Sequence, residues 1–193
     1  MLLATALMGM SLYQTAKLGA VTDAHFVAAL STQGMSEQAI ANARGLLLDA
    51  LGPGGVLGSR SYQCQVFEVD LGNPDRQACR ALRINVSGTV GFVVSGTLCP
   101  GTDGNWHESS GPGMLTSISL DQRWRDATLK TDTSLYGEPM LSSYRGRFTK
   151  PNLSVQVGSH AWRESLAFAY VRLPNGDTHY VLKDAVTLLG QGK

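Results

Sequence analysis

The sequence lacks the charge, the cysteines and the short motifs that would assign it directly to a reaction. Its formal net charge is only +1, so neither a nucleic-acid footprint nor an acidic partner is indicated. Three cysteines are too few for a disulfide scaffold. A Gly-x-Ser-x-Gly turn and a Gly-Lys-Ser/Thr phosphate loop are both missing. These absences argue against the common serine hydrolases and the P-loop nucleotide enzymes.

Metal-ligand spacing is also missing, because no Cys-x-x-Cys or His-x-His pair occurs. The histidines are scattered along the chain at His25, His107, His160 and His179. We therefore expect no metal site and no cofactor. A hydrophobic content of 43% with only 16% charged residues is typical of a folded globular chain.

Two helices are predicted in the first third of the chain. Residues 36–51 carry apolar side chains at helical spacing, while residues 22–30 show a shorter run of the same kind. Ser36 is a suitable N-cap, and Gly52 followed by a proline ends the helix. The apolar residues 2–10 are too few to span a bilayer. They predict a membrane-proximal segment or a first helix that packs on the domain.

After a glycine-rich linker at residues 52–58 the periodicity changes to that of strands. Residues 62–67 predict a first strand, which ends in a turn at residues 72–75. Residues 82–94 alternate apolar and polar side chains around Ser87-Gly88, which predicts a hairpin. Later strands are expected at residues 115–120, 124–130, 153–157, 167–173 and 178–182.

A cysteine lies near each open end of the predicted hairpin. If its strands pair, Cys79 and Cys99 approach within the range that a disulfide requires. Cys64 with Cys79 is the second pairing considered. A reactive thiol, Cys99 with His107, is the competing interpretation of these sulfurs, although it needs a neighbouring cation or helix N-terminus to lower the thiol pKa.

The hairpin carries a recognisable signature. Cys79-Arg80, a strand run, Gly96-Thr97-Leu98-Cys99 and Asp103-Gly104-Asn105-Trp106 follow one another. The order resembles the C-terminal signature of the bacterial seventeen-kilodalton surface antigen family, which are small envelope lipoproteins. Leu98 replaces the family's usual alanine, and Pro100 its usual arginine. The resemblance implies a location in the cell envelope, periplasmic or associated with the outer membrane, and implies no particular activity.

The last third of the chain resembles the end of bacterial SH3-like barrels. A tryptophan strand, a Tyr-Val-x-Leu strand, a turn at Asn175-Gly176 and a closing Tyr-Val-Leu strand occur in that order. SH3-like modules bind in shallow aromatic grooves, so the resemblance nominates four aromatic residues. The expected binding residues are Tyr136, Tyr144, Trp162 and Tyr170, with core packing as the alternative for each.

A local excess of basic residues adds two further candidates for binding. Arg145 and Arg147 alternate with aromatic residues, as do Arg123, Arg125 and Lys150 nearby. Guanidinium groups pair with carboxylates or phosphates and stack on rings, so this stretch suits an anionic polymer or a peptide. The alternative is a solvated strand edge protected by charge.

The sequence therefore predicts an α+β protein with N-terminal helices followed by antiparallel β modules, the last an SH3-like barrel. The expected divisions are residues 1–57, 58–110 and 111–193. The predicted function is non-catalytic binding or scaffolding in the bacterial envelope, with peptidoglycan or other envelope proteins as partners. Membrane association through the N-terminus and oligomer formation stay open. The alternative is a cell-wall- or protein-directed hydrolase that uses a Cys/His pair.

Overall fold

The computed structural model describes residues 15–52, 55, 57–62, 65–72, 78–88, 91–120 and 123–190. The predictions for residues 2–10, for Cys64 and for the centre of the turn after residue 72 lie outside these ranges. Within them, no helix combines the length and the apolar character that crossing a membrane requires.

Two helices open the described chain, as the sequence predicts. Helix α1 covers Ala20–Thr32 and helix α2 covers Glu37–Leu51. The Ser36 side chain accepts a hydrogen bond from the Ala39 backbone N–H at 3.3 Å, which satisfies one of the free donors of the first turn of α2. Both predicted helices are thereby confirmed.

Antiparallel strands make up most of the rest. The first six are β1 (Leu57–Tyr62), β2 (Gln65–Leu71), β3 (Arg80–Ser87), β4 (Phe92–Pro100), β5 (Trp106–Glu108) and β6 (Thr116–Ser119). Tyr62 and Gln65 are cross-strand partners, so Tyr62 belongs to β1. The strand predicted from residue 62 to the turn at residue 72 ends as expected, but it begins only at Gln65. β1 and β2 pair antiparallel, so the chain reverses direction between them. The predicted hairpin is present as β3 and β4.

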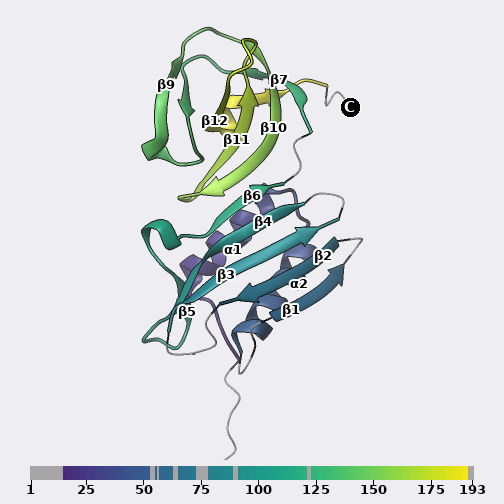
Figure 1. Cartoon of the computed structure of the whole chain (residues 1–193), viewed down its shortest axis with the longest axis vertical. Coiled ribbons are helices and arrows are strands. Elements are labelled where there is room, and N and C mark those ends of the chain that lie inside the picture. Colours follow the sequence, from purple (N-terminus) through teal and green to yellow (C-terminus); the bar gives the residue numbers. More distant parts are fainter. Residues whose placement is uncertain are drawn as a thin grey trace, which may run out of the picture.

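The N-terminal half is a sheet covered by helices on one face. Its strand order is β1-β2-β3-β4-β6, with β5 added beside β4, and Figure 1 shows α1 and α2 behind these strands. Phe26 of α1, Leu47 of α2 and Ile84 of β3 are fully buried in one shared core. The predicted segments 1–57 and 58–110 therefore pack together as one unit.

The remaining strands form the C-terminal half. They are β7 (Arg125–Leu129), β8 (Thr133–Tyr136), β9 (Tyr144–Phe148), β10 (Leu153–Arg163), β11 (Leu166–Arg172), β12 (Thr178–Leu182) and β13 (Val186–Leu188). Figure 1 shows them as a curved group beyond β6. Their own core contains Leu129, Val155, Val171 and Val181. All five strands that the sequence predicts after residue 114 are found.

Strand β10 joins the two halves. Its first part pairs with β7, and after an irregularity between Val157 and Ser159 its last part pairs with β6. Trp162 near its end is 3% exposed and packs in the N-terminal core. Strand β6 also pairs with β4, and Leu115 is buried in that same core, so the N-terminal half extends beyond the boundary expected at residue 111.

The C-terminal strands follow one path of pairings. It runs from β13 through β7, β10, β11, β12 and β8 to β9. Among the described strands, no pairing connects β9 back to β7 or β13. The structure therefore shows an α+β protein with a large antiparallel sheet, and it does not show the closed SH3-like barrel.

Candidate functional site

The predicted disulfide is confirmed. Cys79 and Cys99 are bonded across the open end of the β3–β4 hairpin, where Arg80 is the cross-strand partner of Leu98. The Cys99 sulfur is thus not a free thiol. His107 does lie opposite Cys99 on β5, but this pair has no nucleophile while the disulfide is intact. The predicted Cys99/His107 pair is therefore not present as a free thiol and imidazole in this structure.

Two residues close to these cysteines in the sequence, Arg80 and Trp106, also have structural roles. Arg80 is 1% exposed and donates to the Ala50 carbonyl at 3.3 Å and to the Gly55 carbonyl at 2.5 Å, so it caps the end of α2. Trp106 is buried in the N-terminal core. This part of the chain therefore supplies a disulfide, a helix cap and a core contact.

The loop before Trp106 is held by Asp103. Its carboxylate accepts from the Asn105 backbone N–H at 3.0 Å and lies 2.9 Å from His107 Nε2. The hydrogen bonds with His107 and Asn105 lower the pKa of Asp103 to about 2. The His107 ring lies where a side chain at Gly19 or Gly101 would be, which explains both glycines. This exposed cluster orders a turn.

A different surface gathers groups suited to binding. Ala169 and Val171 of β11 point into the C-terminal core, so Tyr170 and Arg172 point to the opposite side of the sheet. We call this side the outer face and define it by the residues that neighbouring strands place around these two. It comprises Trp124, Asp126, Gln156, Tyr170, Arg172 and Tyr180.

Three rings and one guanidinium lie in contact on the outer face. The ring centroids of Tyr170 and Tyr180 are 4.8 Å apart, and those of Trp124 and Tyr170 are 6.0 Å apart. The Arg172 Cζ lies 4.0 Å from the centroid of Trp124, in a cation–π geometry. A Cβ on Gly158 would lie 3.0 Å from the indole of Trp124. Glycine at this position therefore leaves room for the indole ring.

The outer face is also hollowed. One cavity of about 390 Å³ is lined by Trp124, Asp126 and Gln156 among others. A second of about 350 Å³ is lined by Asp126, Gln156 and Arg172 among others. The two cavities share two lining residues, so they adjoin. Burial raises the pKa of Tyr180, with Tyr170 and Glu138 adding to the shift, which keeps that phenol a hydrogen-bond donor.

The predicted binding residues are only partly brought together. Tyr170 belongs to the outer face. Tyr136 is buried at the cross-strand partner position of Tyr180 and contacts Tyr144, which is 55% exposed, at 6.2 Å between centroids. Trp162 is a core residue.

Strand β9 carries Arg145 and Arg147, both exposed. The Arg145 guanidinium lies over Gly137. Strand β9 is the last strand of the path, and β12 and β8 separate it from β11, which carries Arg172. The two arginines are therefore not neighbours of Arg172 in the sheet. The sequence does not nominate Arg172 and Gln156. The only sign of them in the sequence is that each is a polar residue at a position of a predicted strand that alternates with buried apolar residues.

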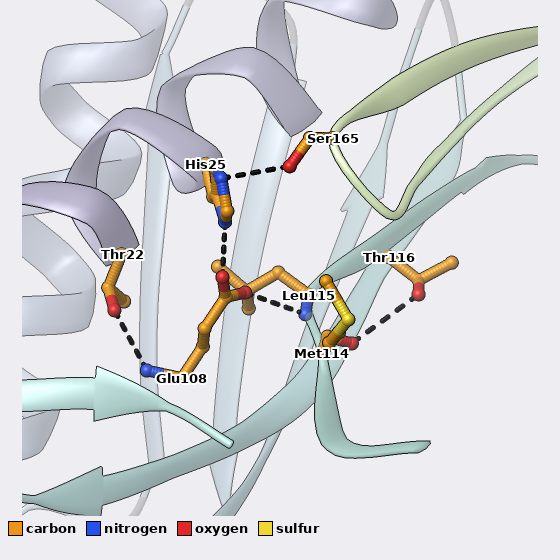
Figure 2. Close-up of polar contacts among 7 residues, drawn as sticks. All are labelled: Thr22, His25, Glu108, Met114, Leu115, Thr116 and Ser165. Carbon is orange, nitrogen blue, oxygen red and sulfur yellow. Dashed lines mark hydrogen bonds and ion pairs between the residues drawn. The ribbon is translucent and has the colours of Figure 1, made fainter. Parts of the chain in front are cut away.

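A second polar cluster lies where the two halves meet (Figure 2). His25 of α1 contacts Glu108 of β5 through Nδ1 and Ser165 of the β10–β11 turn through Nε2, the latter at 3.0 Å. Glu108 also accepts from the Leu115 backbone N–H at 3.0 Å. The His25 ring lies 5.3 Å from that of Trp162. This cluster links three elements that are remote in sequence, and no motif announces it.

His160 supplies a pH-dependent element of stability. Its Nδ1 is buried without a hydrogen-bond partner among the described residues. Burial, with Lys183 and Arg125 nearby, lowers the pKa of His160 from 6.5 to about 4. The unfolded chain takes up a proton below pH 6.5, whereas the folded protein does so only near pH 4. Stability should therefore fall as the pH drops through this window.

We expect this proton uptake to remove about 3 kcal/mol of unfolding free energy across the window. Urea denaturation at pH 7 and at pH 4.5 measures the difference. His160→Gln is the control, because it cannot take up the proton and should give a flatter pH dependence. Identical pH dependence in both proteins would contradict the assignment.

Comparisons with protein-family models, with curated proteins and with solved structures find no match to this chain. Within the described ranges, no three His, Cys, Asp or Glu side chains gather in a way that would hold a metal ion. The geometry of the outer face and of the His25 cluster is therefore the basis for any functional conclusion.

Proposed function

We propose that this protein is a binding or scaffold protein of the bacterial cell envelope, working by contact and not by turnover. Its C-terminal half acts as an SH3-like binding module. The observation that carries the proposal is the outer face, where Tyr170 contacts both Trp124 and Tyr180, a guanidinium lies over Trp124, and two cavities adjoin. Aromatic-lined surfaces with a few polar groups are typical of peptide-binding modules.

The location in the envelope is supported by the disulfide. Stable disulfides form in oxidising compartments and are rare in the cytosol. Cys79 and Cys99 are bonded through a signature that resembles an envelope lipoprotein family. Peptidoglycan and other envelope proteins are therefore the proposed partners, with neither nucleic acid nor a cofactor involved.

The proposal predicts that single tyrosines of the outer face are needed for binding to isolated peptidoglycan sacculi. Tyr170→Ala and Tyr180→Ala each remove a ring from the contacting set and should weaken binding about ten-fold, the usual scale for an aromatic anchor. Co-sedimentation of the full chain with sacculi measures this. Tyr62→Ala is the control, because Tyr62 lies on β1 in the other half. Equal binding by all four proteins would refute the proposed surface.

A hydrolase is the second candidate function, and the residues that favour it are not the predicted cysteine pair. Ser165, His25 and Glu108 have the order of a nucleophile, base and orienting acid, with Ser165 Oγ 3.0 Å from His25 Nε2. In acyl transfer, Ser165 Oγ adds to the carbonyl carbon as its proton moves to His25. The leaving group then takes that proton, and water cleaves the acyl-serine ester.

Binding is preferred because a joining role explains the same cluster. Glu164 and Ser165 form a two-residue turn with φ values of 52° and 62°. Asn-Gly is the pair of residues that favours such a turn most strongly. Because Glu and Ser occupy it instead, we attribute their presence to the contacts that their side chains make. Glu164 accepts from the Leu141 backbone N–H and Ser165 meets His25 across the junction. Labelling of Ser165 by a fluorophosphonate probe, lost in Ser165→Ala, would establish the hydrolase; an unlabelled protein supports the joining role.

A further inference from the structure

We propose that the outer face binds a peptide that carries a free carboxylate, and that Arg172 is the group that pairs with this carboxylate. The inference rests on the proposed binding function and adds the chemical class of the ligand. It comes from the charges of the outer face, which form a row across three strands.

The first step is the state of Arg172. It lies exposed at the end of β11, and its guanidinium is held over the Trp124 ring at 4.0 Å. No salt bridge of Arg172 is found among the described residues, whereas Arg44 and Arg60 each have an aspartate partner. The contact with the Trp124 ring restrains the guanidinium. Since no carboxylate of the described residues pairs with it, its N–H groups are available to a carboxylate of the ligand. An oriented guanidinium of this kind suits a planar carboxylate.

The second step is the neighbouring polar groups. Gln156 is the cross-strand partner of both Arg172 and Asp126, so the three residues lie side by side on β11, β10 and β7. Neighbouring strands are about 4.8 Å apart, which separates the cation from the anion by roughly 10 Å. Both cavities of the outer face are lined by Gln156 and Asp126. A cation, an amide and an anion therefore follow one another along the hollow.

The third step is the ligand that fits this row. An extended chain advances about 3.3–3.6 Å per residue, so roughly three residues span from Arg172 to Asp126. A carboxylate pairs with Arg172, backbone amide groups meet Gln156, and an amine or N–H donor pairs with Asp126. The rings of Trp124 and Tyr170 supply apolar contact area beside the chain. A glycan strand stripped of its peptides keeps carboxylates on its sugars, but it lacks the backbone amides that meet Gln156 and the amine that pairs with Asp126.

The test compares three forms of peptidoglycan as probes for the full chain. They are intact sacculi, sacculi whose carboxyl groups have been converted to amides, and glycan strands stripped of their peptides. The wild-type protein should bind intact sacculi about ten-fold more tightly than either altered probe, the scale of one charged hydrogen-bonded pair.

Arg172→Ala should lose the same factor on intact sacculi and show no further loss on amidated sacculi. Arg83→Ala is the matched control, since Arg83 is an exposed arginine on β3 of the other half. Equal wild-type binding to intact and amidated sacculi would overturn the carboxylate inference. If that binding still depends on Tyr170 and Tyr180, the proposed function stands alone. Absence of sacculus binding by the wild type would overturn both.

Discussion

Trp162→Ala is expected to lower the free energy of unfolding by about 3–5 kcal/mol, the cost typical of deleting a large buried aromatic side chain. Trp162 comes from β10 of the C-terminal half, yet it is 3% exposed within the N-terminal core. Its removal leaves a cavity at the junction and takes away the ring beside His25. Guanidinium denaturation followed by far-UV circular dichroism measures the loss.

Trp124→Ala provides a contrast within the same chain. Trp124 is a partly buried tryptophan on the outer face, in contact with Tyr170 and Arg172. Its removal should cost less stability than that of Trp162 and should weaken binding to sacculi. If Trp162→Ala proves as stable as Trp124→Ala, the two halves do not share the core that the structure shows.

Replacing both Cys79 and Cys99 by serine is expected to lower the unfolding free energy by about 3 kcal/mol, as the loop-entropy relation gives for a closed loop of this size. The two residues are 20 positions apart in sequence. Without the bond, the unfolded hairpin samples many more conformations, and the folded state gains nothing in return. Urea denaturation of the double variant measures the change.

Cys64→Ser is the control for the disulfide prediction. It removes a cysteine from the same chain but leaves the bonded pair intact, so its unfolding free energy should stay near that of the wild type. Adding reductant to the wild type should reproduce the loss seen in the double variant. A double variant as stable as the wild type under oxidising conditions would show that the disulfide does not hold the hairpin.

Local features were predictable from the sequence because their determinants lie close together in the chain. The cap at Ser36 and the end of α2 depend on adjacent residues. The β3–β4 hairpin is set by an alternating run around one turn, and its register brings Cys79 to Cys99. The start of β2 is placed too early by the sequence because the side-chain alternation runs on from β1, so periodicity alone does not separate the two strands.

The outer face could be predicted only in part because its members come from four strands. Gln156 meets Arg172 across the β10–β11 hairpin, but it meets Asp126 only because β10 pairs with β7, and β8 and β9 lie between those two strands in the sequence. The resemblance to SH3-like modules nominates the binding rings without regard to their burial, and burial removes Trp162 and largely covers Tyr136. Which ring is buried depends on how the two halves pack, and no short pattern records that.

The His25 cluster lay beyond sequence reasoning for the same reason. Ser165 and His25 are 140 residues apart, and Glu108 is 83 residues from His25. Each is an ordinary polar residue in its own segment. Only the packing of α1 against the end of β10 brings them into contact, so this feature of the junction is a product of tertiary structure.

Hydrogen–deuterium exchange with soluble peptidoglycan fragments tests the central claim most directly. The account predicts slower exchange in β10, β11 and β12, the strands that carry Gln156, Tyr170 and Tyr180, with little change in α1 and β5. Protection confined to the segments around His25 and Ser165, or no protection anywhere, would contradict a binding role for the outer face.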